Sequence, residues 1–191
     1  VEHDLIGGNG HVDIDVDRTG ERGGGQVGGE GEGVAPRQDV TGETVRVALM
    51  RLLRNDLEGA RIIDLFAGTG ALGLEALSRG GKYVDFVEFR PSSLHALKAN
   101  IAALGVREKT RVYKKDALPF AGALPSGKFD IAFADPPYES KMLDRLIESW
   151  HRQKFSTILA IEHARVHVLP PIVKPQHTQV FEDSAISVYR L

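Results

Sequence analysis

The sequence predicts an α/β fold with a mostly parallel, seven-stranded sheet, helices on both faces and an antiparallel hairpin at the C-terminal end. Two observations carry this prediction. Short apolar runs alternate with amphipathic helical patterns over residues 43–162, and such alternation is typical of a parallel sheet covered by helices. Residues 179–190 have the pattern of two strands around a tight turn at residues 182–184.

The first regular element expected is a helix from Glu43 to Asn55. Val45, Leu49, Leu52 and Leu53 recur at intervals that place them on one helical face. That face is expected to pack on the sheet.

The stretch RIIDLFAGTGALG at residues 61–73 predicts a buried strand, a glycine-rich turn and a helix from about Ala71. Gly68 and Gly70 allow backbone angles that other residues avoid, and they let the main chain approach a ligand closely. The free N–H groups at the start of the helix would point at that ligand. Asp64 lies inside the strand, where a carboxylate is costly to bury without a polar partner. The stretch therefore predicts a cofactor cradle.

Four more strands and two more helices follow from the same alternation. The strands are expected at Lys82–Glu88, Thr110–Asp116, Phe129–Asp135 and Ser156–Glu162. One helix should begin at Pro91, a favourable first helical residue, and end at Gly105. Its apolar stripe consists of Leu94, Leu97, Ile101 and Leu104. The other helix carries Leu143, Leu146, Ile147 and Trp150.

The N-terminal part of the chain differs in composition from the rest. Residues 1–33 contain eleven glycines, eight acids and two bases, a net charge of −6, whereas the remaining residues have a net charge of +4. Residues 11–17 alternate apolar and acidic side chains, as in a strand with one wet face. We therefore predict two parts: an acidic, glycine-rich arm at residues 1–36, either a hairpin or flexible, and the main domain at residues 37–191.

Composition excludes several classes of site. The chain has no cysteine, so cysteine nucleophiles, cysteine zinc sites and iron–sulfur clusters are excluded, and a reducing compartment such as the cytoplasm is expected. The seven histidines are scattered without zincin-like spacing, so no metal is expected. No apolar run is long enough to cross a membrane, and the acidic start is unlike a signal or transit peptide.

Glu88, Asp116 and Asp135 each end a predicted strand. Taken singly, such an acid is usually a helix cap or a turn former. The carboxyl ends of parallel strands meet at one edge of the sheet, where ligands bind. Together with the glycine turn, Glu88 is placed for ribose hydroxyls and Asp116 for an adenine edge.

The residues 68–73, GTGALG, also satisfy the dinucleotide pattern G-x-G-x-x-G, so an NAD-dependent oxidoreductase is an alternative. Asp64 argues against it, because its carboxylate would repel a pyrophosphate and attract an ammonium group. S-adenosylmethionine carries an adenosine and an ammonium group but no phosphate. It therefore fits the cradle better than NAD.

The sequence Asp135–Pro136–Pro137–Tyr138 predicts a site for an exocyclic amine. Prolines fix the backbone and have no N–H to donate. The Pro136 carbonyl and the Asp135 carboxylate are then two acceptors for the hydrogens of one NH₂ group, while Tyr138 can stack on the base. The amine of a base is a poor nucleophile, so positioning and preorganised electrostatics must supply most of the rate.

These residues resemble the S-adenosylmethionine-dependent methyltransferases that act on exocyclic amines, and more narrowly the small-subunit ribosomal RNA guanine-N2 methyltransferases, the RsmD-like group. The resemblance covers about residues 41–191. It is carried by DLFAGTGALGLEALSRG (64–80), VEFRPSSLHALKANIAALG (87–105), DPPY (135–138) and DSAISVYR (183–190). It implies a class I methyltransferase fold, which is Rossmann-like.

The resemblance also implies the roles of the site residues. The catalytic set would be Asp135, Pro136, Pro137 and Tyr138. The cofactor S-adenosyl-L-methionine would be bound by Asp64, Phe66, Ala67, Gly68, Thr69, Gly70, Glu88, Phe89, Asp116 and Ala117. The activity implied is methyl transfer to the N2 amine of a guanine in small-subunit (16S) ribosomal RNA. The partner would be that RNA or a small-subunit assembly particle, and a monomer is expected.

Two alternatives remain open at this point. The amine site alone does not distinguish guanine N2 from the adenine N6 or cytosine N4 of DNA, so a DNA amine methyltransferase is one alternative. The other is a catalytically silent module that binds cofactor or RNA, because residues 1–33 are acidic where the family has a basic hairpin, and RNA affinity depends strongly on cations.

Overall fold

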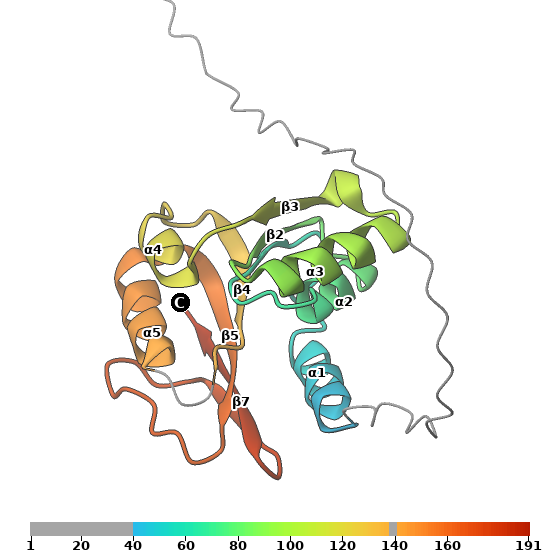
Figure 1. The fold of residues 1–191 in the computed structure, drawn as a ribbon. Helices are drawn as coiled ribbons and strands as arrows, with labels where there is room; N and C mark the ends of the chain where they lie inside the picture. Colours follow the sequence, from blue (N-terminus) through green and yellow to red (C-terminus); the bar gives the residue numbers. More distant parts are fainter. Residues whose placement is uncertain (1–39, 138–140) are drawn as a thin grey trace, which may run out of the picture. The chain divides into compact units, whose positions relative to one another are not determined.

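The structure is a computed structural model that describes residues 40–137 and 141–191. Its elements in chain order are α1 (Val40–Leu52), β1 (Arg61–Asp64), α2 (Ala71–Ser78), β2 (Tyr83–Val87), α3 (Pro91–Ala103), a 3₁₀ turn (Arg107–Lys109), β3 (Thr110–Tyr113), α4 (Ala117–Gly122), β4 (Phe129–Ala134), α5 (Met142–Gln153), β5 (Ser156–Ala164), β6 (His177–Val180) and β7 (Ser184–Arg190). Figure 1 shows α2 and α3 on one side of the strands and α4 and α5 on the other.

The strands form one seven-stranded sheet in the order β3-β2-β1-β4-β5-β7-β6. The pairs from β3 through β5 are parallel, whereas β7 is antiparallel to both β5 and β6. The predicted parallel sheet with a C-terminal antiparallel hairpin is therefore confirmed. Because the chain moves outward from β1 to β3 and then returns to the other side of β1, the direction of winding changes between β1 and β4. Ligands bind at such a switch point, beyond the carboxyl ends of the strands.

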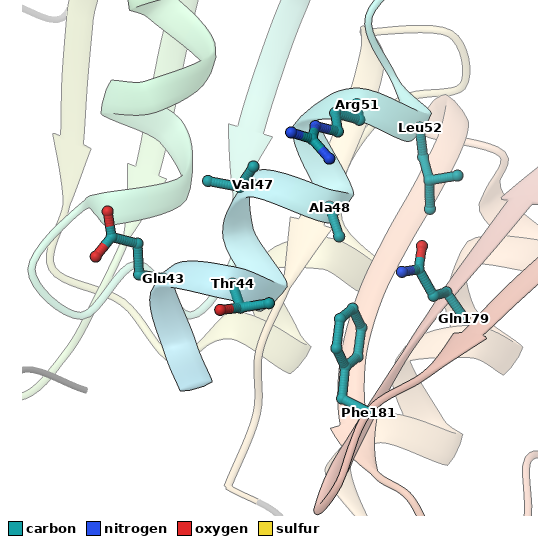
Figure 2. Close-up of a pocket in the computed structure, with 8 residues that line it drawn as sticks. All are labelled: Glu43, Thr44, Val47, Ala48, Arg51, Leu52, Gln179 and Phe181. Carbon is teal, nitrogen blue, oxygen red and sulfur yellow. The ribbon is translucent and has the colours of Figure 1, made fainter. Parts of the chain in front are cut away.

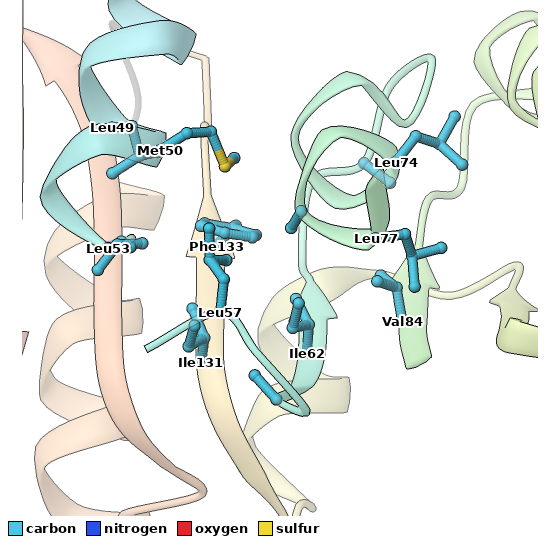
Figure 3. Close-up of a cluster of buried hydrophobic side chains, with 14 of the residues drawn as sticks. Leu49, Met50, Leu53, Leu57, Ile62, Leu74, Leu77, Val84, Ile131 and Phe133 are labelled. Carbon is cyan, nitrogen blue, oxygen red and sulfur yellow. The ribbon is translucent and has the colours of Figure 1, made fainter. Parts of the chain in front are cut away.

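Two apolar clusters cover the two faces of the sheet, because successive side chains of a strand point to opposite faces. Ile62 belongs to the cluster that α1 and α2 complete, with Leu49 and Leu77 among its members. Figure 3 shows these helices packed over the strand residues. The neighbouring Ile63 belongs to the opposite cluster, which contains Trp150 of α5. The central strands are thus buried on both faces.

An ion pair between Arg61 and Asp130 joins the amino ends of β1 and β4. The Arg61 guanidinium donates to both carboxylate oxygens of Asp130 at 2.8 and 3.0 Å, and the Arg61 backbone N–H donates to the same carboxylate at 2.7 Å. This ion pair lies at the end of the sheet opposite the edge where the site is expected. It helps to fix the register on which the site depends.

The structure differs from the predicted elements at several boundaries, including that of β5, which ends at Ala164 rather than at Glu162. Helix α1 begins and ends three residues earlier than expected. β3 ends at Tyr113, and α4, which was not predicted, begins shortly after it. Leu104, expected on the apolar face of α3, is 60% exposed, because the helix ends one residue before it. β6 begins at His177, two residues before the predicted hairpin.

The predicted arm at residues 1–36, and with it the boundary at residue 37, lies outside the described residues and stays a prediction. Within the described ranges, no helix is long and apolar enough to cross a membrane. The same ranges contain no cluster of three or more histidine, aspartate or glutamate side chains arranged to hold a metal ion.

Candidate functional site

The turn after β1 is built from two glycines with left-handed backbone angles. Gly68 has φ of 55° and Gly70 has φ of 85°, and Gly70 is the N-cap residue of α2. A Cβ atom at Gly70 would lie 2.5 Å from the Leu97 Cδ1 atom, whereas one at Gly68 would meet no heavy atom nearer than 3.9 Å. Gly70 is therefore required by packing as well as by its backbone angle, while the space beside Gly68 is open.

Asp64 lies at the end of β1 and is buried. Its Oδ2 atom accepts a hydrogen bond of 3.1 Å from the backbone N–H of Gly73, in the first turn of α2. Burial raises the pKa of Asp64 to about 7, and the nearby carboxylates of Asp135 and Glu88 add to this rise. A cation bound beside Asp64 would favour the charged form of its carboxyl group. A cationic ligand would therefore lower the pKa of Asp64.

Glu88 follows β2 directly, and its carboxylate is held by backbone N–H groups. Its Oε2 atom accepts from the N–H of Gly68 at 2.9 Å, and its Oε1 atom accepts from the N–H groups of Phe89 and Arg90 at 2.9 and 2.8 Å. The Arg90 guanidinium forms an ion pair with it at 3.3 Å. Burial alone would raise the pKa of Glu88, but the Arg90 and Gly68 hydrogen bonds outweigh burial and lower it. Glu88 is therefore a fixed anion that ties the glycine turn to β2.

Asp116 is the N-cap residue of α4, and its side chain accepts from the N–H of Leu118 at 3.1 Å. This is the capping role that a lone acid after a strand often has. Together with Ala117, Asp116 also lines a pocket of about 460 Å³ at the carboxyl ends of the strands. Capping and ligand contact are compatible, because a carboxylate has several acceptor positions.

Asp135, Pro136 and Pro137 follow β4 directly. Burial raises the pKa of Asp135 to about 7, the carboxylate of Glu162 raises it further, and Arg90 opposes the rise. Solvent nevertheless reaches the Asp135 side chain. Both facts fit a carboxyl group on the wall of an open pocket, surrounded by protein on its other sides. The fourth residue of the predicted set, Tyr138, lies outside the described residues.

A pocket of about 460 Å³ brings the strand-end residues together. It is lined by Leu65, Phe66, Val87, Glu88, Phe89, Arg90, Lys115, Asp116, Ala117, Asp135, Pro136, Pro137 and Met142. Eight predicted site residues are therefore on its wall. Five others, Asp64, Ala67, Gly68, Thr69 and Gly70, belong to the strand end and turn beside it without lining it, although Gly68 is bonded to Glu88.

Sequence reasoning missed Arg90 as a site residue. It lines the pocket, pairs with Glu88 and lowers the pKa of Asp135. The signal was available, because Arg90 follows two predicted site residues, Glu88 and Phe89, in the chain.

A second pocket, of about 420 Å³, adjoins the first and shares Asp135 with it. Its other lining residues are Gly42, Glu43, Arg46, Ala71, Leu72 and Glu162. They come from the start of α1, the start of α2 and the carboxyl half of β5. Asp135 therefore lies where the two pockets meet.

A third pocket, about 600 Å³, lies elsewhere, between α1 and β6. Figure 2 shows its lining residues, which include Val47, Ala48 and Leu52 of α1 together with Gln179 and Phe181. None of the predicted site residues that the structure describes lines it. The predicted site residues on their walls therefore favour the two smaller pockets as the functional site.

The family model described as "Conserved hypothetical protein 95" matches residues 29–183. A Bacillus subtilis protein named "Putative rRNA methyltransferase YlbH" is 33% identical over 138 residues, which cover 70% of this chain and 75% of that protein. A Haemophilus influenzae protein named "Ribosomal RNA small subunit methyltransferase D" is 28% identical over 165 residues, covering 84% and 83% of the two chains.

Among solved structures, the "Putative methyltransferase yhhF from Escherichia coli" superposes with a TM-score of 0.70 at 27% identity, covering 81% of this chain and 88% of the other. This likeness, over most of both chains, confirms the predicted class I methyltransferase fold.

Proposed function

Because the chain belongs to the family described as Conserved hypothetical protein 95, we propose that it transfers a methyl group from S-adenosyl-L-methionine to the N2 amine of a guanine in small-subunit ribosomal RNA. The observation that carries this proposal is the position of Asp135 and Pro136. They line the same pocket as Glu88, Phe89 and Asp116, so the proposed amine acceptors adjoin the residues proposed to bind the cofactor.

The residues around the larger of the two site pockets fit S-adenosylmethionine. The anionic Glu88 and Asp116 are placed to accept hydrogen bonds from hydroxyl and amino groups, while Phe89 is 60% exposed and offers an aromatic face. Buried Asp64 suits an ammonium group more than a phosphate. The volume of about 460 Å³ is in the range of small-molecule sites.

When bound, this cofactor supplies a methyl group on a positively charged sulfur. Asp64, Ala67, Gly68, Thr69 and Gly70 would hold its methionine end. Glu88 would accept from its ribose hydroxyls. The adenine would lie near Asp116 and Ala117, with Phe66 and Phe89 supplying apolar and aromatic surface.

On the substrate side, two acceptors are proposed to hold the two hydrogens of the guanine N2 amine. The Pro136 carbonyl is one acceptor, and the Asp135 carboxylate is the other. Held in this way, the nitrogen presents its face to the cofactor pocket, and its geometry approaches the tetrahedral form that a new N–C bond requires. Positioning of this kind lowers the barrier without any covalent contribution from the protein.

The amine gains a methyl group and loses one proton in the reaction. Asp135 can take that proton, because its pKa of about 7 lies close to working pH. Tyr138 remains proposed as the stacking partner of the base.

A guanine inside a helix cannot reach these groups, so the target must be unpaired or flipped out of its stack. Lys114, Lys115 and Lys141 are exposed cations and are candidates for contacts with RNA phosphates. A protein that acts on small-subunit RNA or its assembly particles would work in the cytoplasm, and we propose that it acts as a monomer.

The proposal is tested by incubating the purified protein with labelled S-adenosylmethionine and, separately, assembling small-subunit particles, naked ribosomal RNA and DNA. Mass spectrometry of the nucleosides should detect N2-methylguanosine in the ribosomal RNA. Methylated adenine or cytosine in DNA would instead support the DNA alternative. Calorimetric binding of the cofactor without transfer to any nucleic acid would support the silent module. The names of the two relatives above favour ribosomal RNA.

A further inference from the structure

The second pocket, about 420 Å³, contains charged groups that the proposed methyl transfer does not use. Besides Asp135, its charged lining residues are Glu162 of β5 and Glu43 and Arg46 of α1. A pocket that receives only an amine would need none of them. Their side chains come from elements far apart in the sequence, and residues at the start of α2 line the same pocket.

Glu162 lies close enough to Asp135 for its negative charge to act on that carboxyl group. Arg46 makes no ion pair with any residue in the ranges 40–137 and 141–191, and its side chain is partly accessible. The pocket therefore presents the carboxylates of Asp135 and Glu162, a third and exposed carboxylate from Glu43, and one strong donor around the place where a base would enter.

We propose that this pocket reads the Watson–Crick edge of the target guanine, with Glu162 accepting from N1–H and Arg46 donating to O6 while Asp135 holds N2. This inference rests on the proposed function and names the residues that choose the base.

The donors and acceptors of this pocket complement the Watson–Crick edge of guanine but not that of adenine. The guanine edge carries the N2 and N1 hydrogens side by side, followed by the O6 acceptor. Two neighbouring carboxylates and a guanidinium complement that order. Adenine carries a lone pair at N1, which a carboxylate repels, and has no amine at position 2. A polar site that leaves a substrate's groups unpaired rejects that substrate strongly.

The test uses small-subunit particles in which the guanine methylated by the wild-type protein is first mapped and then replaced by 2-aminopurine. This base keeps the N2 amine but has a lone pair at N1 and no O6. The wild-type kcat/KM should be about 10- to 100-fold lower on 2-aminopurine than on guanine, since each good base contact contributes discrimination of this order.

Glu162→Gln should reduce that ratio to about threefold or less, because the glutamine amide can donate to the N1 lone pair of 2-aminopurine. Arg46→Ala should lower kcat/KM on guanine and leave that on 2-aminopurine unchanged. Glu148→Gln, on the exposed face of α5, is the matched control and should keep the wild-type ratio.

Three results would overturn the inference. If Glu162→Gln lowers kcat/KM equally on both bases, Glu162 has only a structural role. If Arg46→Ala lowers both equally and weakens the salt dependence of binding, Arg46 contacts a phosphate. If the wild-type protein makes no N2-methylguanosine, the proposed function fails first, and the inference falls with it. Cofactor affinity and thermal melting of each variant show whether it is folded.

Discussion

The backbone N–H of Gly68 donates a hydrogen bond of 2.9 Å to the Oε2 atom of Glu88. This bond joins the turn after β1 to the end of β2, two segments that are twenty residues apart in the chain. The other oxygen of Glu88 is held by the N–H groups of Phe89 and Arg90. A single carboxylate therefore fixes the shape of both loops that border the proposed cofactor pocket.

Glu88→Gln should weaken both the fold and cofactor binding. Glutamine is similar in size, but its amide nitrogen cannot accept a hydrogen bond, and the loss of charge leaves Arg90 without its partner. Hydrogen bonds to a charged group contribute about 1.5–3 kcal/mol each, so we expect a loss of about 2 kcal/mol or more in the free energy of unfolding, measured with urea. Calorimetry should show at least tenfold weaker binding of S-adenosylmethionine. Unchanged values for both would contradict the role given to Glu88.

Gly70→Ala should destabilise the protein more than Gly105→Ala. Both glycines have positive φ, 85° and 67°, so each substitution introduces backbone strain of about 1–2 kcal/mol. At Gly70 the new Cβ atom would also lie 2.5 Å from the Leu97 Cδ1 atom, whereas at Gly105 it would meet nothing within 4 Å. Overpacking adds about 1–3 kcal/mol. Equal losses of unfolding free energy in the two variants would show that the contact with Leu97 is relieved without cost.

The order of the elements could be predicted because it depends on local pattern. β4 and β5 contain the continuous apolar runs Ile131–Ala134 and Ile158–Ile161, as expected for strands buried on both faces, and α3 has a proline at its start. Helix α4 was missed because it has only six residues, too few to show an amphipathic period. The end of β3 was misplaced for a related reason: residues 114–116, KKD, continue the strand pattern but lead into the cap of α4.

The site could be predicted only where its residues follow strand ends in the chain. Glu88 and Asp135 are such residues, and the structure places both on one pocket wall. Glu162 lies within β5, which continues two residues beyond it, and Arg46 lies on α1. Arg46 does not follow a strand end, whereas Glu162 ends the strand predicted at Ser156–Glu162 and had the same signal as Glu88. Their proximity to Asp135 depends on the packing of α1 and on the strand order, which sequence periodicity does not specify.

Asp64 should make stability depend on pH in an unusual direction. Its pKa is raised from 3.8 to about 7 in the folded protein, so between these values the folded state keeps a proton that the unfolded state has lost. Stability should therefore fall as pH rises from about 4 to about 7 and should change little from this cause above 7. At about 1.4 kcal/mol per pKa unit, the whole effect has an upper limit of about 4 kcal/mol.

Asp64→Asn should flatten this part of the stability profile, measured by urea unfolding at a series of pH values. The exposed Asp183→Asn is the control and should keep the wild-type dependence. A profile of Asp64→Asn that is parallel to the wild-type profile between pH 4 and pH 7 would assign the dependence to other groups, of which Asp135 is the first candidate.

Methyl transfer should rise with pH through about 7, because only the ionised Asp135 accepts both a hydrogen bond and the released proton, and its pKa is raised to about 7. Asp135→Ala should lower kcat/KM at least 100-fold while cofactor affinity changes by less than about threefold, since the carboxylate acts on the substrate amine. Asp135→Asn separates the two roles, because its amide oxygen still accepts a hydrogen bond but takes no proton. Its residual activity should therefore lose the inflection near pH 7. An Asn variant with the same inflection as wild type would mean that another group, such as Asp64, sets the pH dependence of transfer.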